Sequence, residues 1–341
     1  MKIFIIQSGT YQEDGTLQYS ITSKRQVASL QSLGIEVGIG LVTGRTSLQE
    51  IRANIRRLKV EVKAFNPDLI HAHYGSVVGL VASRIAAKTP LVVSFCGDDL
   101  LGTPNPGLQW RVREKLARQL SLRAASKARW IIIKSQNLKM ALPKRLRKKA
   151  SVVPNGVNSE FFAPMSKRDC RKAMEWGSEP VIFFNGSSGT NAKVKNLELA
   201  LKTLEQLKKA YPNARLESVS QVSPRELKIR MCASDCVLVT SLHEGSPNIV
   251  KEAMACNIPV VSVNCGDVTL RLRGVTKGGV YPYDPEKLAE GIIRVLRNHS
   301  KFNGRELFLH QGLAEHEISG RILEVYQRAI YGKETFKTQE D

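Results

Sequence analysis

The sequence predicts an α/β protein of two domains, each with a parallel β-sheet between layers of helices. Apolar strand-like stretches alternate with amphipathic helical stretches along the chain, a pattern typical of parallel sheets covered on both faces. The 341 residues suit two domains, and 42% hydrophobic residues suffice for two cores. A turn-forming segment at 152–157, with Pro154, Asn155 and Gly156, separates the halves.

The elements of the first half follow one another with clear stop signals. Strands are expected at 2–6, 36–42, 68–73, 91–95 and 130–134, and helices at 23–33, 47–65, 77–87 and about 110–124. Gly34 ends the first helix, and Gly97 ends the fourth strand.

The second half starts a new strand–helix series. Strands are expected at 181–185, 236–240 and 259–263, and helices at 197–210, 247–256, 285–298 and about 315–331. We therefore expect an amino-terminal domain at 1–153 and a carboxyl-terminal domain at 154–313. Residues 314–341 are expected to form a terminal helix and tail, with the helix packing back toward the amino-terminal domain.

Several classes of protein are disfavoured by the sequence. The first apolar run stops after four residues, and no stretch approaches the roughly 18 apolar residues of a membrane span, so we expect a cytoplasmic location, with peripheral attachment to the inner membrane face as an option. The six cysteines form no C-x-x-C pair and are expected to be buried or free thiols. His71 and His73 share a strand face, and Asp98 adjoins Asp99, but neither pair has an identifiable third ligand, so no metal or cofactor is expected.

The positive charge is concentrated in one segment. The net charge is +20, and residues 101–150 contain 14 Lys or Arg against one acid, Glu114. The patches at 111–129 and 144–149 would attract an anionic membrane, an anionic substrate or nucleic acid, although no nucleic-acid-binding motif accompanies them. An apolar stripe runs through the first patch, and it either packs on the sheet beneath solvated charges or belongs to a membrane-facing surface: Val112, Leu116, Leu120 and Ala124.

The segment 240–256 has the features of an anion-binding turn, because it leads from the carboxyl end of a strand into a helix. Ser246 is expected to be the N-cap and Pro247 the first helical residue, so that free N–H groups and the positive helix end favour a phosphate. Gly245 allows close approach to a ligand. Glu244 and Glu252 can accept hydrogen bonds from a sugar or ribose diol. The alternative is an ordinary strand–turn–helix with two solvated glutamates.

The full string of this segment, "SLHEGSPNIVKEAMACNIPVVS", resembles the Glu-x7-Glu donor signature of the retaining GT-B glycosyltransferases of family 4, also called glycosyl transferases group 1. Most of the chain contributes to the resemblance, which is strongest over 151–330. The other matching strings occur in the family's order: "DLIHAH", "PLVVSFCGDD", "VVPNGVNSEFFAP", "NAKVKNLELALKTLEQL", "GGVYPYDPEKLAEGIIRVL" and "RILEVYQRAI". The resemblance implies two Rossmann-like domains that face each other across a cleft.

The resemblance also implies roles for individual residues. The carboxyl-terminal domain would hold a nucleotide-sugar donor, with Glu244 beside the sugar, Glu252 on the ribose and Lys195 on the diphosphate. Asp99 and Cys96 would lie on the acceptor side. The remaining donor contacts would come from the loop and start of the helix, and from the loop after the first strand: Gly245, Ser246, Pro247, Asn248, Ile249 and Gly15.

Two positions depart from the family pattern. An arginine that often precedes the lysine in a "GR" pair is absent, because the string here is Asn185-Gly186-Ser187-Ser188. A histidine that many members carry in an H-G-x-D pattern is replaced by Cys96, although Asp99 matches the aspartate. No base for Cys96 is identifiable, so a neutral or packed thiol is expected rather than a nucleophile.

The predicted function is transfer of a hexosyl or related sugar from a nucleotide-diphosphate sugar to a hydroxyl acceptor. By resemblance, the reaction retains anomeric configuration and needs no metal, and cell-surface polysaccharide or glycolipid synthesis is the expected setting, with a lipid-linked acceptor as one option. Two alternatives stay open. One is a basic membrane- or nucleic-acid-binding protein of the same fold with a degenerate donor site. The other is a different GT-B enzyme, such as a sugar-nucleotide epimerase.

Overall fold

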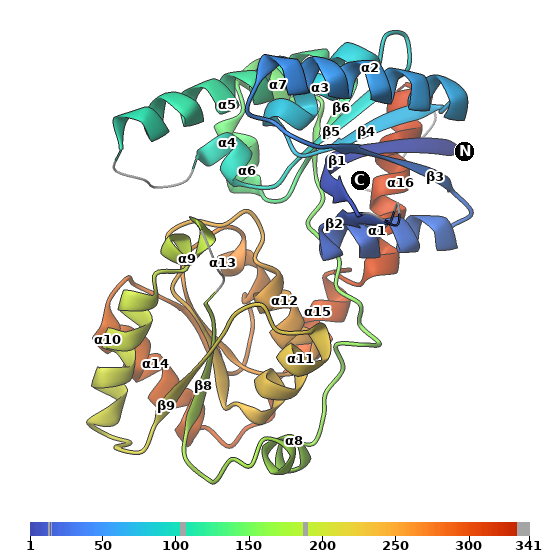
Figure 1. Cartoon of the computed structure of the whole chain (residues 1–341). Helices are drawn as coiled ribbons and strands as arrows, with labels where there is room; N and C mark the ends of the chain where they lie inside the picture. The colour runs from blue at the N-terminus through green and yellow to red at the C-terminus, as the bar shows by residue number, and fades with distance from the viewer. Residues whose placement is uncertain (13, 15, 103–106, 187–189, 333–341) are drawn as a thin grey trace. The chain divides into compact units, whose positions relative to one another are not determined.

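The computed structural model describes residues 1–12, 14, 16–102, 107–186 and 190–332. The chain divides into two compact units, each an α/β layered structure (Figure 1). Unit 1 comprises Met1–Gly156 and the chain from Glu315 onward, and unit 2 comprises Val157–Ala314. The sequence placed the boundaries after residues 153 and 313, and the structure places them after Gly156 and Ala314, three residues and one residue later. Each unit is described by itself.

Unit 1 is organised around a sheet whose parallel strands run in the order β3-β1-β4-β5-β6-β7. β1 has parallel neighbours on both sides, β3 and β4, and β2 pairs antiparallel with its last residues. Beyond β4 the order is β5, β6, β7, all parallel. The order of the chain therefore reverses between β1 and β4, which is the switch point where open α/β sheets bind ligands. The described strands are β1 (Lys2–Tyr11), β2 (Leu17–Tyr19), β3 (Glu36–Val42), β4 (Leu69–His73), β5 (Leu91–Phe95), β6 (Trp130–Ile133) and β7 (Ala150–Val152).

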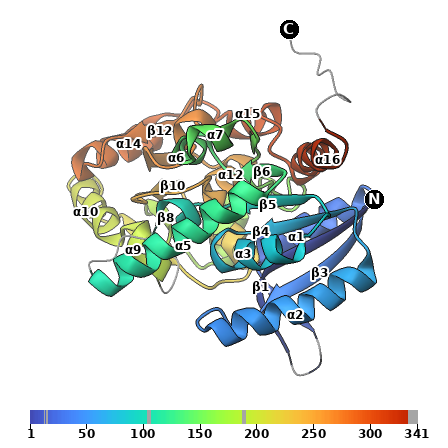
Figure 2. The ribbon, with the colours of Figure 1, turned by 90° about the horizontal axis from the view of Figure 1, so that it is seen from above.

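Helices cover both faces of this sheet. Successive β1 residues point to opposite layers, so Phe4 and Ile6 pack with α2, α3 and α5, while Ile3 and Ile5 pack with α1 and α16. Figure 2 looks onto α2, α3 and α5 lying over the strands. The helices of unit 1 are α1 (Ile21–Ser32), α2 (Leu48–Phe65), α3 (Ser76–Ile85), α4 (Asp98–Leu101), α5 (Leu108–Lys127), α6 (Gln136–Ala141), α7 (Lys144–Arg147) and α16 (Glu315–Tyr331).

The terminal helix α16 belongs to unit 1 although it follows unit 2 in the chain. It packs beside α1 (Figure 1) and buries Ile318, Ile322 and Tyr326 in the layer against β4, β5 and β6. At Gly156 the backbone lies close to the start of α16, because a Cβ there would be only 2.7 Å from the Glu315 Cα.

Unit 2 repeats the same topology in a smaller sheet. The order is β12-β11-β10-β8-β9, with every pairing parallel, so the switch point lies between β8 and β10. The described strands are β8 (Val181–Asn185), β9 (Arg215–Val219), β10 (Cys236–Val239), β11 (Val260–Val263) and β12 (Gly278–Tyr281). The helices are α8 (Lys167–Ala173), α9 (Thr190–Lys195), α10 (Leu197–Lys208), α11 (Pro224–Ala233), α12 (Asn248–Ala255), α13 (Val268–Arg271), α14 (Pro285–Arg297) and α15 (Gly304–His310).

The cysteines of unit 2 are part of its apolar core. Five free thiols are buried there, which confirms the reading of the cysteines as packed or free: Cys170, Cys232, Cys236, Cys256 and Cys265. Within the described residues, no helix is both long enough and apolar enough to cross a lipid bilayer.

Candidate functional site

In unit 2, a lysine and a glutamate from distant parts of the chain meet at the switch point. Lys195 ends α9, and Glu244 lies in the loop between β10 and α12. The Lys195 Nζ is 2.6 Å from the Glu244 Oε1, and the Ser241 hydroxyl donates to the same oxygen at 3.0 Å. The two charged side chains are 17% and 18% exposed, so the pair is screened by water only in part.

Backbone contacts fix this pair independently of its own attraction. The Thr240 hydroxyl donates to the carbonyl oxygens of Lys195 and Asn196 at 2.7 and 2.9 Å. The Leu242 N–H donates to the Val194 carbonyl at 2.9 Å. The loop after β10 is thus tied to the junction of α9 and α10, and this places Glu244 next to Lys195.

The start of α12 differs from the sequence prediction. Pro247 is the N-cap and Asn248 the first helical residue, so assigning Ser246 as N-cap and Pro247 as first helical residue was wrong. The Ser246 hydroxyl donates instead to Asp267 Oδ2 at 2.9 Å and accepts from the buried Lys251 Nζ at 3.0 Å. Because Pro247 makes no side-chain cap, its side chain leaves the first N–H groups of α12 uncapped.

The other predicted donor residues lie on this loop and helix. Glu252 is buried on α12, and Ile249 is buried one turn before it. The Asn248 Oδ1 is buried without a hydrogen-bond partner in the described part of the chain. Lys193, the neighbouring lysine, is exposed. Gly15, Ser187 and Ser188 lie outside the described residues.

Sequence reasoning missed Gly266, which shapes the same loop. Its φ is +58°, and a Cβ there would lie 2.8 Å from the carbonyl oxygen of Gly245 and 3.1 Å from the Glu244 Cβ. Only glycine allows the loop after β11 to approach the Glu244 loop this closely. The signal was available as Asn264-Cys265-Gly266-Asp267 directly after a buried strand.

In unit 1, Asp99 organises two loops at the sheet edge. It is 3% exposed and accepts hydrogen bonds from the N–H groups of Gly75 at 2.9 Å and of Cys96 and Gly97 at 3.0 Å. Burial raises the pKa of its carboxyl to about 6, although these N–H groups act in the opposite direction. Asp99 therefore holds together the loops after β4 and β5.

Cys96, whose N–H donates to Asp99, lines a cavity. The Cys96 residue is exposed to the cavity, but protein atoms surround its thiol closely. This desolvation, together with the nearby charge of Asp99, raises the pKa of the thiol to about 12. The thiol is neutral near pH 7, as expected from the sequence, and a neutral thiol is a poor nucleophile.

His71 and His73 are both hydrogen-bonded within unit 1. The ring nitrogens of buried His71 contact the Tyr326 hydroxyl and the Ser94 hydroxyl, each at 2.7 Å. Those of His73 contact Ser23 Oγ at 2.9 Å and Gln26 Nε2 at 3.1 Å. Burial lowers the pKa of His73 to about 3, so this ring is neutral. Both rings are thus held by hydrogen bonds to side chains of unit 1.

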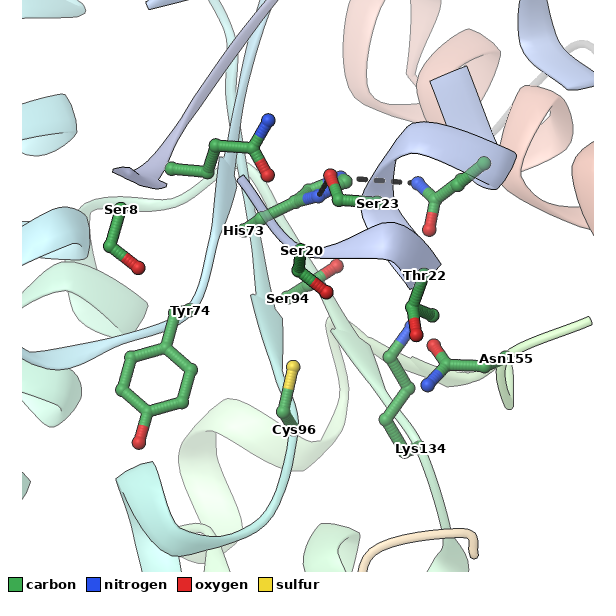
Figure 3. A pocket seen from close by; sticks show the side chains of 12 residues that line it. Ser8, Ser20, Thr22, Ser23, His73, Tyr74, Ser94, Cys96, Lys134 and Asn155 are labelled. Atoms are coloured by element: carbon green, nitrogen blue, oxygen red, sulfur yellow. Dashed lines mark hydrogen bonds between the residues drawn. The ribbon is translucent and has the colours of Figure 1, made fainter. Parts of the chain in front are cut away.

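A cavity of about 230 Å³ opens at the switch point of unit 1, where β1, β4, β5 and β6 end (Figure 3). Cys96 lines it, and so do two residues that sequence reasoning did not single out, Gln7 and Lys134. The available signal was a lysine that directly follows four apolar residues of a buried strand.

The basic segment packs on the fold only in part. Ala124 of α5 is fully buried, but Val112 and Leu116, on the same stripe, are 61% and 54% exposed. Reading the whole stripe as packed on the sheet is therefore wrong for the first half of α5. In the second patch, Arg147 donates to the carbonyl oxygens of Leu142 and Met140 at 2.8 and 2.7 Å.

Comparison with known proteins identifies relatives of both units. Residues 12–161 match the family model "Glycosyltransferase Family 4", and residues 215–298 match "Glycosyl transferases group 1". A putative teichuronic acid biosynthesis glycosyltransferase, TuaC of Bacillus subtilis, is 25% identical over 67% of this chain and 61% of its own length. An uncharacterized glycosyltransferase of Methanocaldococcus jannaschii, MJ1178, is 25% identical over 68% and 66%. The matches thus span less than two thirds of these relatives.

Solved structures share the fold at low identity. Sucrose-phosphate synthase from Thermosynechococcus elongatus superposes with a TM-score of 0.77 at 16% identity, covering 97% of this chain and 100% of that one. Anabaena HepE in complex with UDP-glucose gives 0.74 at 16% identity, covering 95% and 98%. The chain consists of two parallel α/β units, a fold that these structures share, and family models match both of its halves. The chain therefore belongs to the GT-B glycosyltransferases of family 4, the glycosyl transferases group 1.

Proposed function

We propose that this chain transfers a sugar from a nucleotide-diphosphate sugar to a hydroxyl acceptor and that unit 2 binds the donor. The observation that carries the proposal is the Lys195–Glu244 pair beside the start of α12. A lysine and a helix amino terminus supply positive charge for a diphosphate, and a carboxylate next to them can accept hydrogen bonds from a sugar.

In this reaction the protein has to stabilise the departing nucleoside diphosphate. The bond from the anomeric carbon to the acceptor oxygen forms, the bond to the diphosphate oxygen breaks, and negative charge builds up on the diphosphate, which takes up the proton that the acceptor hydroxyl loses. Lys195 and the uncapped N–H groups of α12 would stabilise that charge, and Glu252 would accept hydrogen bonds from the ribose. We further propose that the acceptor attacks from the face that the diphosphate leaves, which retains anomeric configuration.

A uracil nucleotide is the first donor to test. HepE, which shares the fold, has been solved with UDP, with UDP and glucose, and with UDP-glucose. The relation of TuaC to teichuronic acid biosynthesis supports a cell-surface polymer as the setting. Both points support the proposal through similarity alone.

The decisive assay measures UDP release from a panel of UDP-sugars by the purified protein, with water as a slow acceptor. UDP release from one sugar nucleotide over a protein-free blank is expected. A putative UDP-N-acetylglucosamine 2-epimerase from Listeria monocytogenes also shares the fold, at a TM-score of 0.61. An altered sugar without UDP release would favour an epimerase and contradict the proposal.

We also propose that the exposed half of α5 contacts an anionic membrane. Val112 and Leu116 project from a helix whose basic side chains are exposed around them, including Arg111 and Lys115. α4 and α6 neighbour one another, and each adds an exposed apolar side chain, Leu101 and Met140 respectively. Apolar residues among basic ones suit the headgroup region, where each basic residue contributes about 1 kcal/mol.

Sedimentation with liposomes tests this contact. The protein should pellet with anionic liposomes at low salt and be released at high salt, because exposed charges are screened over about 10 Å at 0.1 M. Changing Arg111 and Lys115 to Gln should weaken pelleting, whereas changing the exposed Lys208 and Lys209 of unit 2 should not. Equal binding to neutral and anionic liposomes would contradict the membrane role.

A further inference from the structure

The cavity at the switch point of unit 1 contains a buried cation without a partner. The Lys134 side chain is 4% exposed and lines the cavity just beyond the end of β6 (Figure 3). Within the described residues, no hydrogen bond or ion pair joins its ammonium to another group. A buried charge is normally paired, because removal from water without compensation is costly.

A second polar group in the same cavity also lacks a partner. Gln7 directly follows the part of β1 that pairs with β4. It is 3% exposed, and its Nε2 is buried without a hydrogen-bond acceptor in the described chain. Buried donors are nearly always satisfied in folded proteins, so this amide, beside the unpaired Lys134 ammonium, indicates an acceptor group that is supplied from outside.

The remaining lining is polar and uncharged. The described residues around the cavity include His73, which is neutral, and Cys96, whose thiol is neutral. Lys134 is therefore the source of net charge among the described lining residues. The others carry mostly hydroxyl and amide groups of the kind that bind sugar hydroxyls: Ser8, Ser20, Thr22, Ser23, Gln26, Ser94 and Asn155, with Tyr74.

The charges around Lys134 leave room for an anion. Of the two acidic groups near it, the Cys96 thiol is neutral, so Asp99 is the one that can carry a charge. Asp99 already accepts hydrogen bonds from three backbone N–H groups, so its charge attracts the lysine without a hydrogen bond or ion pair between them. Burial lowers the pKa of Lys134, and a bound anion would reverse that effect.

We infer that this cavity binds a sugar unit that carries an oxyanion, with Lys134 holding the anionic group and Gln7 donating a hydrogen bond to the same sugar. That this sugar is the acceptor rests on the proposed function, whereas its binding rests on the cavity alone. At about 230 Å³, the cavity is smaller than those that bury a drug-sized ligand, about 300–1,000 Å³, and it suits a single sugar unit.

The oxyanion could be a carboxylate, as in a sugar acid, or a phosphate, as in a sugar phosphate. Titration calorimetry with glucose, glucuronate and glucose 6-phosphate separates these sources. At least one anionic sugar should bind about tenfold or more tightly than glucose, the gain expected from a charged hydrogen bond. Equal affinity for glucose and both anions, or no binding of either anion at about 10 mM, would overturn the inference.

Lys134→Met tests the lysine itself. The variant should lose the preference for the anionic sugar, whereas Lys139→Met, on α6 outside the cavity lining, should keep it. Because an unpaired buried ammonium destabilises the free protein, Lys134→Met should melt at the same or a higher temperature than wild type. A large fall in melting temperature would show a structural lysine and refute the assignment.

UDP affinity, measured on the same samples, separates this inference from the proposed function. Lys134→Met should bind UDP as wild type does, because the donor residues are in unit 2. Selective binding of an anionic sugar without any UDP binding would leave the cavity assignment in place and remove its role as the acceptor site. UDP binding without anion selectivity would leave the proposed function in place and remove the cavity assignment.

Discussion

Lys195→Ala removes the cation that we assign to the departing diphosphate. The structure places Nζ 2.6 Å from Glu244 Oε1, and both side chains are mostly buried, so the variant also breaks an ion pair. If Lys195 stabilises the leaving group, turnover should fall by a factor of about ten to a thousand, as when one preorganised donor is lost. That loss corresponds to about 1.4–4 kcal/mol in the activation free energy.

The effect on folding should be smaller. Exposed ion pairs contribute about 0.2–1 kcal/mol, and breaking fully buried ones costs about 3–5 kcal/mol. A pair that is 17% and 18% exposed lies between these limits, and its loop is also fixed by Thr240. We expect a loss of about 1–2 kcal/mol in unfolding free energy for Lys195→Ala, and a similar loss for Glu244→Ala, because each breaks the same pair.

Affinity measurements separate the two roles. Lys195→Ala should weaken binding of both UDP and the UDP-sugar, whereas Glu244→Ala should weaken mainly the UDP-sugar, because we assign its carboxylate to the sugar. Lys193→Ala is the matched control, since Lys193 is exposed and lies two residues away. Turnover that falls more in Lys193→Ala than in Lys195→Ala would refute the assignment.

Three further predictions concern the metal, the donor loop and the thiol. UDP release should survive EDTA, because the scheme uses protein cations; complete loss restored by manganese would contradict it. Gly266→Ala should reduce donor affinity by pushing on the Gly245 carbonyl, whereas Gly274→Ala, also at positive φ but with nothing within 4 Å, should cost only stability, about 1–2 kcal/mol in each case; equal donor affinity in the two variants would exclude a role for Gly266. Cys96 should react slowly with iodoacetamide at pH 8 and faster as the pH rises toward 12, because only the thiolate reacts; rapid alkylation at pH 8 would disprove the raised pKa.

The fold was predictable because its signals are local. β3, β5 and β8 have the predicted bounds, since each is a short apolar run between turn signals. The short strands β2, β7, β9 and β12 were not predicted. β9, for example, is Arg215–Val219, a segment with few apolar residues that becomes a strand by pairing with β8. Tertiary pairing decided its structure over local preference.

The candidate site was predictable as a set of residues but not as a geometry. The local rule for Ser246 failed because its hydroxyl is engaged by Asp267, 21 residues away. The stripe on α5 predicted one apolar face, but helical spacing cannot tell how much of that face is covered, and Val112 and Leu116 are exposed. Lys134 became a candidate ligand-binding residue because its side chain is buried, and the sequence shows only that a lysine follows a strand.

Calorimetric titration of UDP into wild type and Glu252→Ala tests the central claim, that unit 2 holds a nucleotide donor on α12. Loss of an ionised acceptor to the ribose hydroxyls should weaken UDP binding by about ten- to a hundredfold, the equivalent of about 1.5–3 kcal/mol. Glu306→Ala, an exposed glutamate on α15, serves as the control and should bind as wild type does. Unchanged affinity of Glu252→Ala for UDP, and for the other nucleoside diphosphates, would contradict the account.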